Sequence, residues 1–91
     1  MSEEGEITIL RKQLRFRAWH RGTREADLLL GPFADQLLPT CTEAEVQAFA
    51  RLLEVEDPDL WDWATGQKPV APEHNGPVFA ALLKFIAERQ G

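Results

Sequence analysis

Apolar residues recur along this chain at intervals of three and four, which is the spacing of one face of an α-helix. Leu10, Leu14 and Ala18 follow this spacing with basic residues on the other sides, and they predict a helix from about Thr8 to His20. Gly22 follows the last turn, where a left-handed closing residue is common. No run of residues alternates in the way that predicts a β-strand.

Two further helices are predicted between Thr23 and Leu53. Thr23 can cap the first of them, whose buried stripe comprises Leu30, Phe33, Ala34, Leu37 and Leu38. Pro32 falls inside this stripe, and because an interior proline costs roughly 3 kcal/mol, we expect the helix to kink or split there. Thr42 and Glu45 form a capping box ahead of a second apolar face, made of Val46, Phe49, Ala50 and Leu53.

The last third of the chain predicts two more helices. A short one extends from Asp57, as its cap, to about Thr65. Trp61 and Trp63 lie roughly 200° apart around it, so we expect one to be buried and the other to serve a rim or a partner. Residues 66–77 contain three prolines and read as a linker, after which a final helix ends near Gln90.

Five short helices joined by short turns predict an all-α fold, a compact bundle. The 91 residues suffice for one domain and no more. We expect residues 8–90 to form this domain and the acidic residues 1–7 to be a flexible N-terminal segment. Nothing in the pattern requires more than a monomer.

Charge is unevenly distributed along the chain, although the net charge is −5. Residues 7–27 carry six basic and two acidic side chains, whereas four basic and ten acidic side chains follow from residue 28 onward. A basic end of this kind attracts acidic proteins, nucleic acid or anionic lipid alike. It is equally typical of a helix face that is simply solvated, so charge alone does not choose among these.

The N-terminal residues and the cysteine content bear on localisation. The first six residues are acidic and lack the apolar core of a secretory signal. A single cysteine excludes an internal disulfide and fits a reducing compartment. No apolar run approaches the ~20 residues that cross a bilayer. We therefore expect a cytoplasmic, bacterial protein without a membrane span.

Few side chains offer chemistry of their own. His20 and His74 lack metal-ligand spacing, and we expect each to be a surface or capping residue. Cys41 precedes a helix without an evident basic partner, so a small, partly buried side chain is expected. The chain has no glycine-rich phosphate loop. We therefore predict no catalytic residue, no metal and no stably bound cofactor.

The corner between the first two helices, Trp19 to Glu25, admits two interpretations. Basic groups at the end of one helix and a carboxylate at the start of the next suit the helix dipoles, so the corner can be purely structural. Alternatively, Gly22 lets a partner's backbone approach closely, Arg21 presents a planar fork to carboxylates or carbonyls, and Glu25 accepts from a donor.

The segment Arg21–Glu25, R-G-T-R-E, resembles the R-G-x-x-E motif of the succinate dehydrogenase FAD assembly factor family, also called succinate dehydrogenase assembly factor 2. Phe16–Asp35 looks like the first two helices of that family. The R-L-L-E and D-P-D-L blocks within Arg51–Leu60 look like its third and fourth helices. The resemblance covers about residues 14–68, most of the domain, in the right order.

This resemblance implies a small helical bundle that is not an enzyme. It implies binding to the flavoprotein subunit of succinate dehydrogenase, and in some bacteria of fumarate reductase, with covalent attachment of FAD to a histidine of that subunit. FAD is then the cofactor of the partner. The motif residues and their neighbours would lie at the contact: Arg21, Gly22, Glu25 and Asp27, flanked by Arg17, His20 and Arg24.

Three other functions compete with this interpretation. A nucleic-acid or anionic-membrane module would use the basic first helix, but the whole chain is acidic and the helix after the corner lacks base-reading side chains. We therefore predict no nucleic-acid partner. A small helical adaptor would differ in its partner alone. An enzyme acting on flavin would need a tight FAD site, for which the sequence has no signature.

Overall fold

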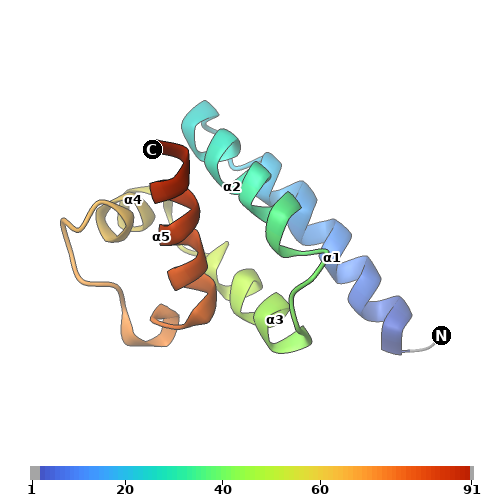
Figure 1. Cartoon of the computed structure of the whole chain (residues 1–91). Helices are drawn as coiled ribbons and strands as arrows, with labels where there is room; N and C mark the ends of the chain where they lie inside the picture. Colours follow the sequence, from blue (N-terminus) through green and yellow to red (C-terminus); the bar gives the residue numbers. More distant parts are fainter. Residues whose placement is uncertain (1–2, 91) are drawn as a thin grey trace.

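The computed structural model describes residues 3–90, which form five α-helices and one short 3-10 turn, and no strand occurs within that range (Figure 1). The elements in chain order are α1 (Glu3–Trp19), α2 (Arg24–Leu37), α3 (Glu43–Leu52), α4 (Asp57–Ala64), the 3-10 turn η1 (Pro72–His74) and α5 (Pro77–Gln90). The predicted all-α fold is confirmed. None of the helices described is long and apolar enough to cross a membrane.

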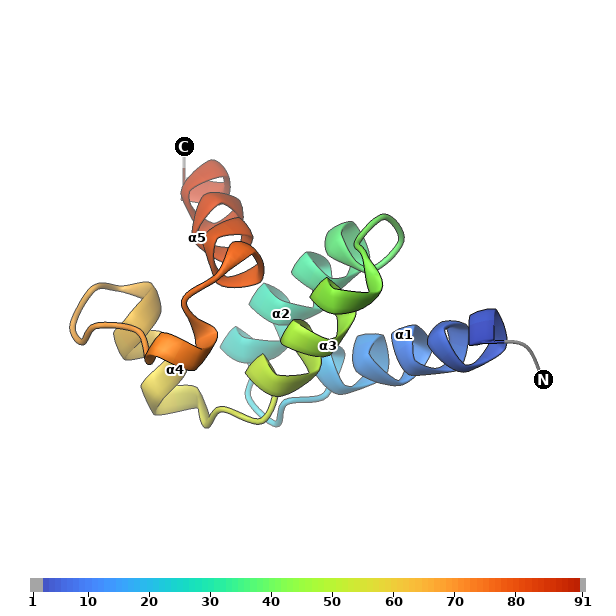
Figure 2. The ribbon, with the colours of Figure 1, turned by 90° about the horizontal axis from the view of Figure 1, so that it is seen from below.

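The helices pack as a small bundle with α1 along one side. α1 and α2 lie antiparallel and side by side, α3 packs on α1, and α5 packs on α2 and α3 (Figures 1 and 2). The radius of gyration is 12.9 Å, close to the ~12 Å of a compact domain of this length. α4 and the linker lie at the opposite end from the chain's N-terminus (Figure 2).

An aromatic cluster occupies the centre of the bundle. Phe33 of α2 lies with its ring centroid 5.7 Å from that of Phe49 of α3 and 5.5 Å from that of Phe85 of α5. The stripes predicted for α2 and α3 face this core, with Leu30 and Val46 fully buried. Burying such side chains contributes about 1.5–3 kcal/mol each, so this cluster holds three helices together.

Two of the three predicted helix caps, Thr23 and Thr42, are present. Thr23 Oγ1 accepts a hydrogen bond from the Ala26 amide at 3.3 Å. The capping box of α3 is complete, because the Glu45 amide donates to Thr42 Oγ1 at 3.2 Å and the Thr42 amide donates to Glu45 Oε1 at 2.9 Å. The bond from the Thr42 backbone, and then the contact with its side chain, lower the pKa of Glu45.

Two predicted helix starts differ from the structure. α1 begins at Glu3 rather than near Thr8, so most of the acidic N-terminal segment is helical, and residues 1 and 2 lie outside the described range. α4 has Glu56 rather than Asp57 at its N-cap. Asp57 is instead the first helical residue, and its carboxylate pairs with Arg21.

α2 runs unbroken through Pro32, so the expected split does not occur. Proline has no N–H and leaves the carbonyl of the residue four positions earlier without its helical donor. That carbonyl belongs to Leu28, and Arg89 of α5 donates to it from Nη1 at 3.0 Å. α5 therefore supplies the hydrogen bond that the proline removes.

Candidate functional site

The corner between α1 and α2 turns at a glycine. Gly22 has φ 111°, a left-handed conformation that strains any residue with a Cβ. A Cβ placed on Gly22 would meet nothing within 4 Å. The glycine is therefore required by the turn, and its outer side is open to solvent.

The side chain of Arg21 points into the protein. Its Nε and Nη2 lie 3.2 and 2.8 Å from Asp57 Oδ1, Nη2 donates to Val55 O at 2.6 Å, and Nη1 donates to Leu53 O. The side chain is only 11% exposed. The fork that we expected to face a partner is thus occupied within the chain, on carbonyls that follow the end of α3.

Asp27 also serves the corner from inside. Its Oδ1 accepts from the Arg21 amide at 2.6 Å, and the side chain is half-buried. Thr23, the cap of α2, donates from Oγ1 to Asp57 Oδ2 at 3.4 Å. The backbone on both sides of Gly22 is therefore held by polar groups of the corner itself (Arg21 and Thr23), of α2 (Asp27) and of α4 (Asp57).

Glu25 faces outward, and the fold places Trp61 beside it. Glu25 is exposed and Trp61 is half-buried. Together with Thr23 and Asp57 they line a shallow pocket of about 430 Å³. The other tryptophan of α4, Trp63, packs on the core with its ring centroid 6.3 Å from that of Phe79. The prediction that one tryptophan is buried is therefore wrong, because both are half-buried and they differ only in that Trp63 packs on the core. Only the structure shows that Trp61 adjoins Glu25.

A second shallow groove of about 580 Å³ lies on the other side of Thr23. Its lining comprises Trp19, His20, Gly22, Thr23, Arg24, Asp27 and Leu28. His20 stacks on Phe16 with ring centroids 4.0 Å apart, and its Nδ1 lies 2.7 Å from Phe16 O. Phe16 is 63% exposed. The corner thus presents open surface on two sides, with aromatic rings on both.

Gly31 is a residue of this site that the sequence did not reveal. A Cβ on Gly31 would lie 2.2 Å from Cδ2 of Trp19, so the indole packs directly on the backbone of α2. Trp19 Nε1 also donates to Asp35 Oδ1 at 3.4 Å. The absence of a side chain at Gly31 therefore sets the position of the ring that lines the groove.

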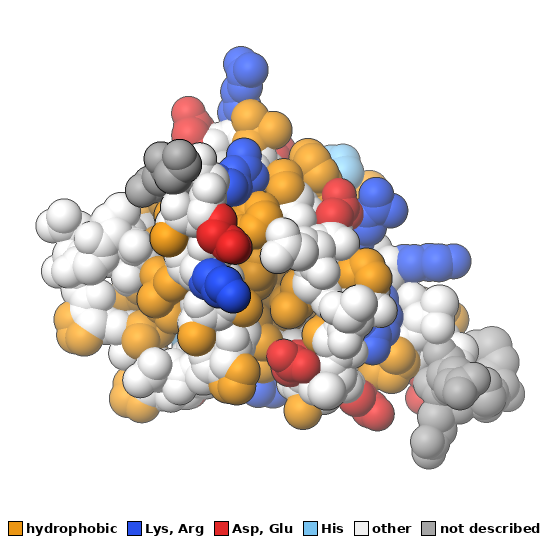
Figure 3. Space-filling view, in the orientation of Figure 1, with side chains coloured by type: hydrophobic (Ala, Val, Ile, Leu, Met, Phe, Trp, Pro, Cys, Tyr) orange, Lys and Arg blue, Asp and Glu red, His pale blue; other side chains and the backbone are white. Residues whose placement is uncertain are grey.

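The side chains of the remaining predicted residues, Arg17 and Arg24, are exposed and make no hydrogen bond or ion pair with the described part of the chain. In the space-filling view, Lys and Arg side chains gather on the side of the molecule that α1 forms (Figure 3). The basic segment predicted from the sequence therefore lies on this side of the molecule.

The groups considered for chemistry are separated. Within residues 3–90, no three His, Cys, Asp or Glu side chains gather closely enough to hold a metal ion. Cys41 is buried as expected, and Arg11 Nη1 lies 3.4 Å from its Sγ, a basic neighbour that the sequence did not indicate. His74 is not the surface residue we expected. Its side chain is 10% exposed and its ring centroid lies 5.6 Å from that of Trp63.

Comparison with known proteins identifies relatives over nearly the whole chain. Residues 12–86 match the profile of the Sdh5 family, described as flavinator of succinate dehydrogenase. The "FAD assembly factor SdhE" of Acetobacter pasteurianus is 35% identical over 88 residues, which cover 97% of this chain and 81% of that protein. No solved structure matches.

Mitochondrial relatives are similar as well. The "Succinate dehydrogenase assembly factor 2, mitochondrial" of Scheffersomyces stipitis is 37% identical over 89 residues, 97% of this chain and 60% of that protein. The protein of the same name from Arabidopsis thaliana is 37% identical over 75 residues, 81% of this chain and 40% of that protein. The chain thus spans less than two thirds of the length of these two relatives.

Proposed function

Because this chain belongs to the Sdh5 family of flavinators of succinate dehydrogenase, we propose that it is an assembly factor that binds the flavoprotein subunit of that enzyme and promotes covalent attachment of FAD. The flavoprotein of fumarate reductase is a second proposed client. FAD is the cofactor of the client, and this chain binds no cofactor stably. The bond to flavin forms within the client, so the chain is not an enzyme.

The observation that carries this proposal is that one residue of the R-G-x-x-E motif faces the protein interior while the other two face solvent. Arg21 is directed inward onto Asp57 and two backbone carbonyls, whereas Gly22 and Glu25 are exposed. Gly22 also serves the turn and Glu25 also suits the dipole of α2, but the exposure of both leaves them available to a partner. The corner has the form of a rigid projection whose backbone is held from inside.

We propose that the docking face consists of Gly22, Glu25 and Trp61. Gly22 lets the client's backbone approach, because no side chain intervenes. Tryptophan is over-represented among the residues that dominate binding energy at protein interfaces. Glu25 accepts from a donor on the client. Arg21 and Asp27 then act as positioning residues, which fix the corner without touching the client.

The test is the amount of covalently bound flavin in the client. We would delete the gene in its host and read flavin fluorescence of the succinate dehydrogenase flavoprotein in a denaturing gel. We expect the band to fade on deletion and to return with the wild-type gene. A band of undiminished intensity in the deletion strain would contradict the assembly role, and the fumarate reductase flavoprotein is read in the same gel.

Complementation with variants tests the docking face. We expect Glu25→Ala and Trp61→Ala to restore little of the band, while Glu6→Ala restores it fully because Glu6 is an exposed acid near the start of α1, at the opposite end of that helix from the corner. Circular dichroism of the purified variants separates lost contacts from lost folding. Full restoration by both corner variants would leave the assembly role standing and remove this face from it.

A further inference from the structure

The outer side of α1 carries two exposed large apolar side chains. Phe16 is 63% exposed and Ile9 is 45% exposed, whereas Leu14 and Ala18 of the same helix are buried in the core. Leu14 and Ala18 each lie two residues from Phe16, roughly 200° around the helix, so Phe16 points away from the bundle. Ile9 precedes Phe16 by seven residues and therefore lies on the same ridge of the helix, about 10 Å along its axis.

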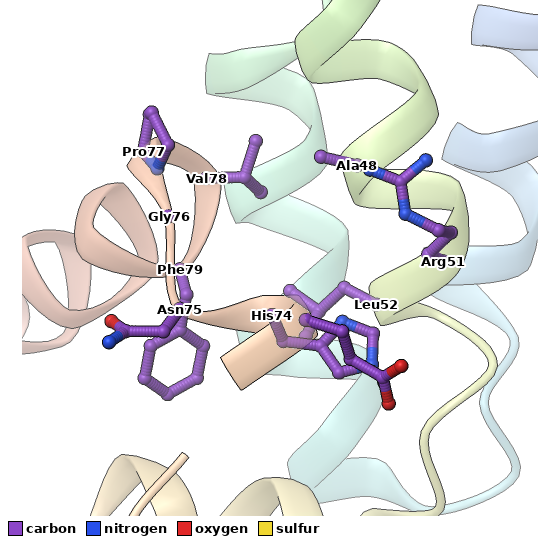
Figure 4. Close-up of a pocket in the computed structure, with 10 residues that line it drawn as sticks. Ala48, Arg51, Leu52, His74, Asn75, Gly76, Pro77, Val78 and Phe79 are labelled. Atoms are coloured by element: carbon purple, nitrogen blue, oxygen red, sulfur yellow. The ribbon is translucent and has the colours of Figure 1, made fainter. Parts of the chain in front are cut away.

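This α1 ridge, Ile9 and Phe16, differs from the apolar surfaces at which two helices meet. Leu52 of α3 and Val78 and Phe79 of α5 line a narrow cleft between those helices (Figure 4), and all three are buried. The ridge has no such cover, because α1 packs on α2 and α3 through its opposite side. Apolar side chains seven residues apart on one helix face are typical anchors in helix-mediated recognition.

The ring of Phe16 is held in its outward position. It stacks on His20 with ring centroids 4.0 Å apart and 19° between the planes, and His20 Nδ1 lies 2.7 Å from Phe16 O. A side chain that is fixed before binding loses less entropy when a partner covers it. His20 also lines the groove beside Gly22, so the α1 ridge is continuous with the docking corner.

The charges around the α1 ridge are all of one sign. Residues 7–20 contain four basic side chains and no acidic one. Two of them, Arg11 and Arg15, bind other parts of the chain. The side chains of Lys12 and Arg17 are exposed and make no hydrogen bond or ion pair with the described residues. Helical spacing places Lys12 and Arg17 on opposite sides of the ridge, so a partner meets positive charge on both flanks.

We propose that the α1 ridge binds an acidic segment of the flavoprotein client that also carries apolar side chains, an inference that rests on the proposed function. Two apolar side chains of that segment, about 10 Å apart, cover Ile9 and Phe16. Its carboxylates pair with Lys12 and Arg17. The continuity through His20 supports this choice of partner, because a client docked at the corner already lies beside Phe16.

An anionic membrane fits the same surface less well. Only Ile9 and Phe16 would enter the bilayer, because the remaining apolar side of α1 is buried against α2 and α3. The net charge of −5 also repels an anionic surface at long range. A narrow apolar ridge between two basic flanks is instead complementary to a protein segment with the opposite charge.

The affinity of the purified full chain for the succinate dehydrogenase flavoprotein tests the apolar part. We expect Phe16→Ser to weaken binding about tenfold. Leu83→Ser is the matched control, because Leu83 is also exposed, at 40%, and lies on α5. α2 and α3 lie between α5 and α1 (Figure 2), so this variant should bind as the wild type does. Circular dichroism reports that both variants are folded.

Reversing one charge tests the electrostatic part. We expect Lys12→Glu to weaken binding about fivefold at low salt and by less at high salt, where the attraction is screened. Lys84→Glu makes the same change at an exposed position of α5 and should leave the affinity unchanged.

The outcomes separate this inference from the proposed function. A wild-type chain that does not bind the flavoprotein would overturn the proposed function and this inference with it. Wild-type affinity in both Phe16→Ser and Lys12→Glu would overturn the α1 ridge alone. Vesicles of phosphatidylcholine and phosphatidylglycerol test the membrane directly. If the wild type sediments with them, Phe16→Ser does not, and both bind the flavoprotein equally, the ridge belongs to a lipid surface and the inference is wrong.

Discussion

Two arginines of this protein hold two different corners by the same means. Arg11 of α1 donates from Nη2 to Cys41 O at 2.9 Å, and from Nη1 to Leu38 O, in the connection between α2 and α3. Arg21 donates to Leu53 O and Val55 O in the connection between α3 and α4. In both cases a guanidinium satisfies backbone carbonyls in the connection that follows the C-terminal end of a helix.

The two corners differ in what each arginine immobilises. Arg11 lies within α1 and braces a turn built of residues without positive φ. Arg21 lies outside the helices, pairs with Asp57 as well, and is followed directly by Gly22 in a left-handed conformation. Only the second arrangement holds an exposed segment with a left-handed glycine in one position, which is what a docking projection requires.

The largest effect should separate the two arginines by stability. Arg21→Met leaves two carbonyls without a donor and leaves the mostly buried Asp57 with only the long bond from Thr23, and it should lower the free energy of unfolding by about 3 kcal/mol. Arg11→Met leaves no carboxylate unpaired and should cost about 1–2 kcal/mol. Urea denaturation of both variants measures the difference, and equal losses would remove the distinction between the corners.

A smaller effect should follow from crowding the corner. Gly31→Ala places a Cβ against the ring of Trp19, and such overpacking should lower the free energy of unfolding by about 1–3 kcal/mol. Gly5→Ala is the control, because it is also helical and its Cβ would meet nothing within 4 Å. Thermal unfolding distinguishes them, and an unchanged melting temperature for Gly31→Ala would show that Trp19 is not fixed by this contact.

A third arginine, Arg89, tests whether a side-chain donor to a free backbone carbonyl stabilises the fold in the same way. Arg89→Met removes the donor to Leu28 O and should lower the free energy of unfolding by about 1 kcal/mol. In a Pro32→Ala background, α2 regains its own donor to that carbonyl, so the same change should cost less. A double-mutant cycle in urea measures this coupling, and a coupling energy of zero would refute the explanation for the unbroken helix.

The smallest effect belongs to the capping box of α3, which has no arginine. Because the pKa of Glu45 is lower in the folded state than its ordinary value of 4.5, its charge stabilises the fold above that value, and the gain is lost as pH falls through the lowered pKa. The stability difference between wild type and Glu45→Gln should therefore vanish in acid. Glu43→Gln, in the same turn, is the control.

The sequence predicted the features that local interactions determine. The helix stripes, the caps at Thr23 and Thr42, and the glycine at the first corner depend on residues within one or two turns of each other, so their patterns can be read directly. The R-G-x-x-E resemblance also located the corner. The sequence could not predict which of the motif's side chains face inward, because Arg21 contacts residues more than thirty positions away along the chain.

The errors share the same origin. Trp61 and Gly31 belong to the corner through packing between helices. Arg89 of α5 supplies the hydrogen bond that Pro32 removes from α2. His74 was expected at the surface, yet the path of the linker brings it against Trp63. Spacing along a sequence contains no record of such long-range contacts, and only the assembled fold reveals them.

The affinity of the purified protein for the succinate dehydrogenase flavoprotein tests the central claim most directly, measured for Gly22→Arg beside Gly66→Arg. Both glycines have positive φ, 111° and 80°, and a Cβ on either would meet nothing within 4 Å, so each substitution adds one charge and strains the backbone. We predict that Gly22→Arg abolishes binding while Gly66→Arg retains it. Equal binding by both variants would contradict the assignment of the first corner as the docking face.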